Sequence, residues 1–359
     1  MKLPLIWFTL VAAALPAAEI ASVAHPQEKL PDGKTVIWTP LFQATWDKLN
    51  ETHGGKPMKV EPPNELISRL DSFTWKMDSV MPEEGWKTWA GPATDEFLAT
   101  VNAEAAKMLG DEEAPFRLQD RREGTVAAFG LLNREVKFRE PFFRSQKVPM
   151  TFSAGNVETK VKFFGVKGQL SNSYGTDVRI LIHAPAEKTH ALQIICKDSN
   201  DTAILFRPPA GSAMDFATAC EQIRTSRKAW ADDSKLNLGP NDPWLHARDE
   251  IQVPYLKLES THDFASDLAS NRFYKDQPHP RLISRAEQEV KFELHEGGAR
   301  VRAKVSAADP FGGEPPEKTT HPRSFLYNAP FFVFLWRDGA EWPYFGSWVG
   351  DASSMEPFN

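Results

Sequence analysis

The chain has 359 residues, of which 41% are hydrophobic and 25% are charged. This composition is typical of a globular protein and argues against a disordered, fibrous or membrane-embedded chain. The formal net charge of −6 and the absence of a block rich in lysine and arginine argue against a nucleic-acid partner. A chain of this length can bury a sizeable core, in one large domain or in two medium ones.

The first 24 residues are typical of a secretory signal peptide. Lys2 supplies the positive end, and residues 3–15 form an apolar stretch that is too short to span a bilayer as a helix. A membrane anchor or a core helix is the alternative interpretation. Small residues that suit a signal peptidase occur in two places, Ser22 with Ala24 and residues 14–18. We therefore expect a signal peptide over residues 1–24, a mature N-terminus between Glu19 and His25, and a secreted or periplasmic protein without a membrane segment.

In chain order, the apolar pattern predicts helices first and strands later. Residues 36–38 form a short β-type run, and Pro40 opens an amphipathic helix. Residues 64–110 are expected to be mainly helical, and the strongest helix covers residues 94–109 because Thr94 is a good N-cap. Strand-like runs then cover residues 125–132, 152–166, 178–184, 191–196, 203–207, 251–258, 289–305 and 325–349, and helices cover residues 213–227 and 263–270. This order favours an α+β class over alternating βαβ units.

None of the common catalytic motifs occurs in the chain. The nine histidines are scattered, and paired acidic residues such as Glu83 and Glu84 lie in polar stretches where solvated charge is the simplest interpretation. We therefore expect no enzyme activity, no cofactor and no metal site. The two cysteines, Cys196 and Cys220, leave two alternatives open: one disulfide bridge in an oxidising compartment, or two buried free thiols.

The C-terminal part of the chain resembles the signature of the serpins, the suicide inhibitors of serine proteases. In that signature an apolar triplet is followed by a polar residue, a Pro-Phe pair and a buried strand, and residues 325–335 follow this order. Ala329 departs from the basic or polar residue that is usual there. Continuous apolar runs on both sides of a turn predict a hairpin buried on both faces. The residues that carry the signature and the family's final Phe-x-Gly strand are Asn328, Pro330, Phe331, Phe345 and Gly346.

Upstream segments resemble the same family in the same order. They are residues 36–41, 142–152, 204–209 and 253–268. Together they extend the resemblance over about residues 35–352, which leaves too few residues for the family's first helix. The resemblance implies a divergent serpin of the secreted bacterial type, with one serpin-like domain over residues 25–359. Its fold would be a multi-sheet α+β fold with N-terminal helices and a buried C-terminal β-hairpin.

The resemblance also implies an exposed reactive loop over about residues 299–323. Three bases in this loop, Arg300, Arg302 and Lys304, depart from the small residues that inhibitory members usually carry. Because side chains alternate in a strand, the three bases would all face solvent if the segment were inserted into a sheet. A fixed strand with a solvated basic face is the alternative. The residues of the expected hinge are Glu296, Gly297, Gly298, Ala299, Val301, Ala303 and Val305.

The expected scissile bond lies in the same loop. The candidate region consists of Phe311, Gly312, Gly313 and Glu314. The bond between Phe311 and Gly312 is the best candidate, because a bond before one of the prolines that follow would be hard to cleave. A large apolar residue at the cut favours a chymotrypsin- or subtilisin-like serine protease as the partner.

Other positions depart from the inhibitory members of the family. Phe138 stands where the family has a tryptophan at the top of its central sheet, and the interior polar cluster near the sheet's opening is replaced by Thr39, Phe42, Gly130 and Gln288. The sequence therefore supports two functions. The first is a secreted, monomeric inhibitor of serine-type endopeptidases, and the second is a non-inhibitory binding or structural protein that keeps the fold. An unrelated secreted enzyme is the weaker third hypothesis.

Overall fold

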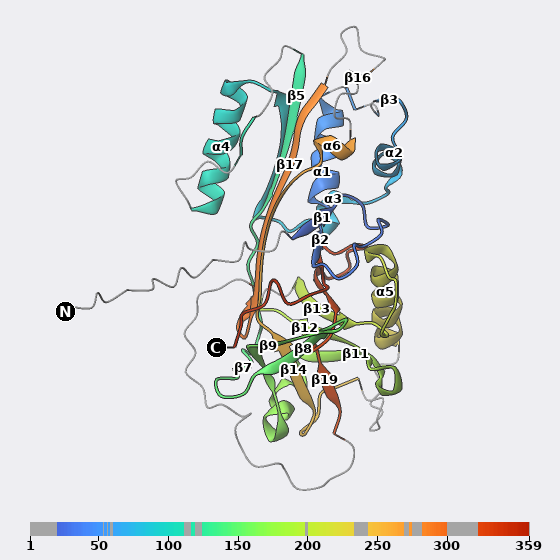
Figure 1. Ribbon diagram of the computed structural model, residues 1–359, viewed down its shortest axis with the longest axis vertical. Helices are drawn as coiled ribbons and strands as arrows, with labels where there is room; N and C mark the ends of the chain where they lie inside the picture. The colour runs from blue at the N-terminus through green and yellow to red at the C-terminus, as the bar shows by residue number, and fades with distance from the viewer. Residues whose placement is uncertain are drawn as a thin grey trace, which may run out of the picture.

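The computed structural model describes residues 20–52, 54–55, 57, 60–110, 116–118, 124–197, 200–232, 243–268, 273–274, 282–299 and 322–358. Helices and several separate β-sheets pack along one long axis (Figure 1), which confirms the predicted α+β class. No helix among these residues is both long and apolar enough to cross a membrane.

A long sheet stands upright in Figure 1, with β5 and β17 at its centre. Its strands are β4 (Trp86–Pro92), β5 (Thr125–Leu132), β17 (Leu282–His295), β18 (Gly298–Ala299) and β6 (Val136–Lys137), and β15 (Leu256–Asp263) also pairs with β17. β5 and β17 run parallel, and their pairing extends from Leu282 opposite Thr125 to Val290 opposite Leu132. The strand expected over residues 125–132 is thereby confirmed.

Residues 64–110 contain less helix than the sequence predicted. Three helices do form there, α2 (Glu65–Ser72), α3 (Met77–Val80) and α4 (Asp95–Leu109), and Thr94 caps α4 by accepting a hydrogen bond from the backbone of Phe97. The segment between α3 and α4 is strand β4, which pairs antiparallel with β5 along its whole length. A segment that ends in Gly-Pro cannot continue as a helix, and the edge of β5 satisfies its backbone groups instead.

Two layers of helix cover the long sheet. α1 (Leu41–Glu51) and α6 (Ala265–Leu268) pack on one face, where Phe42 and Phe264 bring their ring centroids to 4.1 Å. α4 covers the opposite face of β4 and β5, with Val101 and Ala105 fully buried. Figure 1 shows these helices on opposite sides of the upright sheet. The helix expected after Pro40 is confirmed as α1.

The C-terminal hairpin lies in a seven-stranded sheet and is buried as predicted. Phe331, Phe332 and Phe334 have no measurable exposure. α5 (Phe216–Asp232) covers one face of this sheet. The strands, in sheet order, are β1 (Ala21–Val23), β2 (Val36–Trp38), β21 (Phe345–Val349), β20 (Phe331–Arg337), β13 (Asp201–Arg207), β12 (Thr189–Ile195) and β11 (Val178–Ala184).

A four-stranded sheet completes the lower part of the molecule in Figure 1. The strand expected over residues 251–258 divides at Tyr255 into β14 and β15, which belong to different sheets. Gly165 is required here, because a Cβ on it would lie 1.8 Å from the carbonyl oxygen of Ile251. The strands are β19 (Ser324–Leu326), β14 (Glu250–Pro254), β10 (Phe163–Val166) and β7 (Phe143–Arg144), next to the hairpin of β8 (Met150–Ala154) and β9 (Val157–Val161).

The candidate disulfide between Cys196 and Cys220 is not formed. Both thiols are free and fully buried. Cys196 belongs to the core between the sheets, whereas Cys220 lies on α5 and packs against the other face of the seven-stranded sheet. A bridge would have to pass through that sheet. Of the two alternatives that the sequence left open, the structure therefore has the pair of buried thiols.

We expect neither thiol to react with a maleimide reagent in the folded protein. Burial raises the pKa of the Cys220 thiol well above its usual value, so the reactive thiolate is scarce as well as inaccessible. Both thiols should react after denaturation, which mass spectrometry of the labelled chain can count. Electrophoretic mobility that changes on reduction would contradict the assignment of two free thiols.

Candidate functional site at the end of the long sheet

The two central strands of the long sheet separate at one end, and the start of the expected reactive loop lies between them. After His295 the chain turns back and forms β18, which pairs antiparallel with β17 on one side and with β6 on the other. Ala299 lies opposite Leu294 of β17 and opposite Val136 of β6. The long sheet is therefore already open at this end, and the first two residues of an additional strand are in place.

Gly298 is the residue that makes this arrangement possible. Its φ is +136°, and a Cβ on it would lie 2.2 Å from the carbonyl oxygen of Val136. No other residue type fits there without a shift of the backbone. Two backbone hydrogen bonds hold the turn that precedes it: Phe138 N–H donates to Gly297 at 3.0 Å, and Phe142 N–H donates to Glu296 at 2.8 Å.

Glu296, a residue of the expected hinge, is held by a buried chain of polar contacts. The Tyr255 hydroxyl donates a hydrogen bond to the Glu296 carboxylate at 2.5 Å, and Arg144 Nε donates one to the Tyr255 oxygen at 3.0 Å. The Arg144 guanidinium also lies 4.9 Å from the centre of the Tyr255 ring. Burial, followed by the carboxylate contact, raises the pKa of Tyr255, so the phenol stays a hydrogen-bond donor. Sequence analysis missed Tyr255 and Arg144, because they contact Glu296 only in the folded chain.

Phe138 occupies the position expected for it at the end of the central sheet. Its ring makes an edge contact with Phe142, with centroids 5.6 Å apart, and lies 6.4 Å from Phe164. It is 1% exposed. Phe138 can pack as the family's tryptophan would, but it has no ring N–H to donate.

One polar contact survives in the interior near the opening of the sheet. The Thr39 hydroxyl donates to the Gln288 side-chain oxygen at 3.4 Å, and both residues are buried. Gln288 Nε2 is buried and has no hydrogen-bond partner within the described residues. Around Gly130 the space is filled by Thr45 and Leu41 of α1, and Phe42 packs in the apolar layer under the sheet. Of the four positions, only Thr39 and Gln288 therefore form a polar contact with each other, and apolar packing surrounds Phe42.

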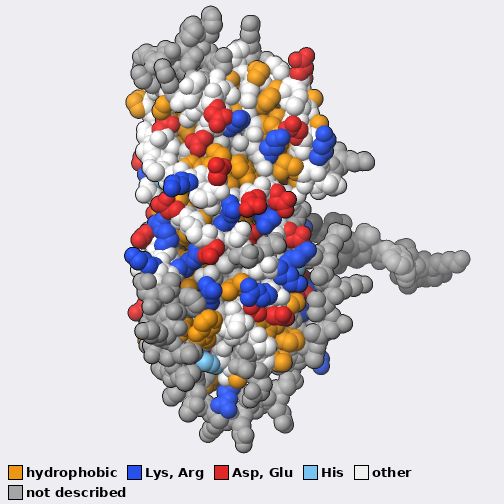
Figure 2. All heavy atoms as spheres, turned by 180° about the vertical axis from the view of Figure 1, so that it is seen from behind, with side chains coloured by type: hydrophobic (Ala, Val, Ile, Leu, Met, Phe, Trp, Pro, Cys, Tyr) orange, Lys and Arg blue, Asp and Glu red, His pale blue; other side chains and the backbone are white. Residues whose placement is uncertain are grey.

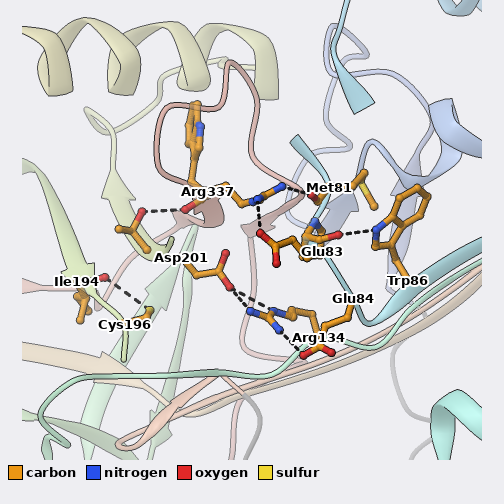
Figure 3. A network of polar contacts seen from close by, with 12 residues as sticks. Met81, Glu83, Glu84, Trp86, Arg134, Ile194, Cys196, Asp201 and Arg337 are labelled. Carbon is orange, nitrogen blue, oxygen red and sulfur yellow. Dashed lines mark hydrogen bonds and ion pairs between the residues drawn. The ribbon is translucent and has the colours of Figure 1, made fainter. Parts of the chain in front are cut away.

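The chain just after the end of β5 is held in place by a buried ion pair. Arg134, two residues after β5, contacts Asp201 of the seven-stranded sheet at 2.7 Å, and the Asp201 side chain is 2% exposed. Glu84 lies 3.5 Å from the same guanidinium (Figure 3). Nearby, Arg337 at the end of β20 donates to the carbonyl oxygen of Met81 at 2.6 Å. These contacts tie the long sheet to the seven-stranded sheet beside the opening.

The far end of the expected loop is fixed by a second buried ion pair. Arg323 precedes β19 and contacts Asp249 at 2.6 Å, with both side chains less than 10% exposed. Sequence analysis missed this pair, which joins residues far apart in the chain. Several expected loop residues lie outside the described residues, namely Val301, Ala303, Val305, Phe311, Gly312, Gly313 and Glu314.

The signature residues make contacts within and between the sheets. Asn328 accepts a hydrogen bond from Arg207 at 2.6 Å. Phe345 stacks on Phe292 of β17 with centroids 4.3 Å apart, so it links the seven-stranded sheet to the long sheet. Gly346 leaves room for the ring of Phe216. The two remaining signature residues, at the entry to β20, are Pro330 and Phe331.

Comparison with known proteins gives a likeness in structure only. No protein-family model and no curated protein matches the sequence. Among solved structures, human thyroxine-binding globulin matches with a TM-score of 0.55 and 12% identity, over 90% of this chain and 93% of the other. Human glycosylated kallistatin matches with a TM-score of 0.54 and 11% identity, over 90% and 93% of the two chains.

Proposed function

We propose that this chain, which has the serpin fold, is an exported inhibitor of serine-type endopeptidases. In this proposal, a protease cuts the loop over about residues 299–323. The part of the loop before the cut then inserts between β5 and β17 as a new strand, and the protease stays attached to it. The observation that carries the proposal is β18, which already lies between the two halves of the opened sheet.

The register of β18 supports insertion without rearrangement of the neighbouring strands. Ala299 of β18 lies between a residue of β17 and a residue of β6. If the same antiparallel pairing continued, Ala303 would lie between Val290 and Leu132. Val290 and Leu132 are also direct partners in the β5–β17 pairing. The inserted strand would therefore separate β5 from β17 without shifting one along the other, and each backbone group would gain a partner.

The alternation of residue types in the loop fits the same register. Ala299 shares its face with Leu294, so the small and apolar residues at 301, 303 and 305 would face the α1 side of the sheet. The bases would face the α4 side. There, Arg300 would lie between Glu293 and Glu135, and residue 304 would lie opposite Glu289. Cross-strand pairs of opposite charge contribute roughly 0.2–1 kcal/mol each. Arg302 would face Lys291, which opposes insertion by a similar amount.

A carrier without inhibitory activity is the second candidate. Thyroxine-binding globulin, one of the structurally similar proteins, is named for binding thyroxine. The β-branched residues at 301 and 305 also slow insertion, because they are bulkier than the alanines that inhibitory members carry, and a slow loop is cut as a substrate before it traps the protease.

Mixing the protein with chymotrypsin- and subtilisin-like proteases tests the proposal. We expect a covalent adduct that survives SDS and has the summed mass of the protease and the cleaved chain. Phe311→Ala should abolish the adduct with these enzymes, whereas Lys160→Ala, on exposed strand β9, should leave it unchanged. Cleavage by every protease of the panel without any adduct would favour the carrier.

Export is part of the proposal, and strand β1 bears on where a signal peptide would be cut. β1 pairs with β2 in the seven-stranded sheet, and the Ser22 hydroxyl lies 3.0 Å from that of Ser260. A cut after Ala24 would remove β1, so the structure argues against a boundary at residue 24. We propose a cut after Ala18, in the other small-residue segment.

N-terminal sequencing of the exported protein is therefore expected to give Glu19 as the first residue. A mature chain that begins at His25 would show that β1 is dispensable. An intact Met1 on a cytosolic protein would refute export itself.

A further inference from the structure

A pocket lies at the end of the seven-stranded sheet that faces β19, away from β18. Its volume is about 800 Å³, and its walls come from β11, β12, the end of β13 and residues 322–328. None of its lining residues is acidic. Figure 2 shows hydrophobic, basic and acidic side chains interspersed over the described part of the rear face. The basic and imidazole residues of the pocket are His183, Lys188, His190, Arg207 and Arg323.

Two positive charges of this pocket have no acidic partner within the described residues. Arg323 is neutralised by Asp249, but no carboxylate pairs with Arg207 or Lys188 in the described part of the chain. Arg207 is half-buried and donates from Nη1 to the carbonyl oxygen of Leu326 at 2.7 Å and to the Asn328 side chain. Burial lowers the pKa of Arg207. A desolvated cation without a counter-ion is costly, and an anion in the pocket would recover part of that cost.

His190 contributes an unsatisfied polar atom to the same wall. The residue is 4% exposed, and its Nε2 is buried without a hydrogen-bond partner in the described part of the chain. Tyr327 and Phe325 make edge contacts with the imidazole, with centroids 4.8 and 5.7 Å away, and fix its orientation. Burial, with a smaller effect of Arg207, lowers the pKa of His190 to about 3, so the imidazole is neutral and carries one N–H. A buried polar nitrogen without a partner costs about 1–3 kcal/mol, and a ligand oxygen beside Nε2 would favour the tautomer that carries the N–H there.

We propose that this pocket binds a small organic acid through its oxyanion, a carboxylate or a phosphate. Arg207 and Lys188 supply the positive charge, and His190 Nε2 donates a hydrogen bond to the oxyanion. Pro185, Pro322 and Leu326 line the same pocket and would contact the carbon part of the ligand. The volume exceeds that of a bare ion, which fits an acid with an apolar chain.

The position of the pocket gives such a ligand a structural effect. Residues 322–326 connect the expected reactive loop to the four-stranded sheet, whereas His190 and Arg207 belong to the seven-stranded sheet. A bound acid would bridge the two sheets at the loop's C-terminal anchor. The ligand should therefore raise the melting temperature of the intact protein, whether or not the protein inhibits a protease.

Titration calorimetry on the mature chain tests the site, with inorganic phosphate, acetate, hexyl phosphate and heptanoate as probes. We expect saturable binding that strengthens when the probe carries an alkyl chain. Lys188→Glu should weaken it about tenfold, the effect of losing one charge-assisted contact. Lys160→Glu is the matched control, because Lys160 is also an exposed lysine without a carboxylate partner among the described residues. It should leave the affinity within about twofold.

The His190 ring gives a second readout, which uses the unaltered chain and so does not depend on the folding of any variant. The NMR signals of the ring should shift until the probe saturates the site, and the titration should give the same dissociation constant as calorimetry. Tighter binding of hexyl phosphate than of heptanoate assigns a phosphate head group, and the reverse order assigns a carboxylate. Absence of saturable heat at millimolar probe with unmoved His190 signals overturns the proposal. Equal weakening by Lys188→Glu and Lys160→Glu also overturns it. That result would mean that the net charge of the protein, and not a contact at Lys188, determines the affinity.

Discussion

Replacing Asp249 by alanine is expected to lower the free energy of unfolding by about 3–5 kcal/mol, which is the usual cost of removing one partner of a buried ion pair. The Asp249 carboxylate accepts two hydrogen bonds from the Arg323 guanidinium, at 2.6 and 3.2 Å, and one from the backbone of His246 at 2.8 Å. Both side chains of the pair are less than 10% exposed. The alanine variant would leave the arginine charge buried beside β19.

Urea unfolding curves of two further variants make this prediction specific. Glu259→Ala breaks an ion pair with Lys257 in which both side chains are more than half exposed, so it should cost less than about 1 kcal/mol. Asp249→Ala combined with Arg323→Met removes both charges and should recover much of the stability. If Asp249→Ala cost no more than Glu259→Ala, the ion pair would not anchor the loop.

Placing a charge on the buried side of the inserted strand is expected to abolish the gain in heat stability after loop cleavage. In the register set by β18, Ala303→Arg would place a guanidinium between Val290 and Leu132, which are 1% and 5% exposed. Burial of an unpaired charge costs several kcal/mol, against about 0.5–1.5 kcal/mol from each hydrogen bond that the strand adds, and an insertion that stops at residue 303 leaves the bonds beyond it unformed. Arg302→Ala is the matched control, because residue 302 would lie on the charged face.

Melting curves of both variants, recorded before and after cleavage of the loop, give the result directly. Arg302→Ala should gain as much heat stability as the unaltered chain, and Ala303→Arg should gain none. Equal gains in the two variants would mean that the inserted strand has another register. A larger gain in Arg302→Ala than in the unaltered chain, together with an undiminished gain in Ala303→Arg, would mean that the basic residues, rather than the alanines, face the core.

The parts of the fold that sequence predicted are those whose signals are local. The buried hairpin of β20 and β21 follows from uninterrupted apolar runs, and Thr94 marks the start of α4 within a few residues of chain. β4 was assigned to a helical region, because its backbone groups are satisfied by β5, more than 30 residues later in the sequence. A strand stabilised by a distant partner leaves little trace in its own residues.

The candidate site divides in the same way. Glu296 and Gly298 were expected at a hinge because of the family resemblance, and Gly298 is a position where a Cβ cannot fit. The contact of Tyr255 with Glu296 could not be predicted, nor could the pair of Asp249 and Arg323, because each joins segments that meet only in the folded chain. The thiols are a similar case: the sequence left a bridge and two free thiols open, and the folded chain decides for free thiols because a sheet lies between them.

The most direct test of loop insertion is the melting temperature of the protein before and after a single cut near Phe311. Limited chymotrypsin digestion should nick the loop, and mass spectrometry identifies the bond. An inserted strand completes the hydrogen bonding of β5 and β17, and each kcal/mol gained raises the melting temperature by roughly 2 °C in a chain of this size. We predict that the cut protein melts well above the intact one. An unchanged or lower melting temperature would contradict insertion and leave the carrier as the function of this fold.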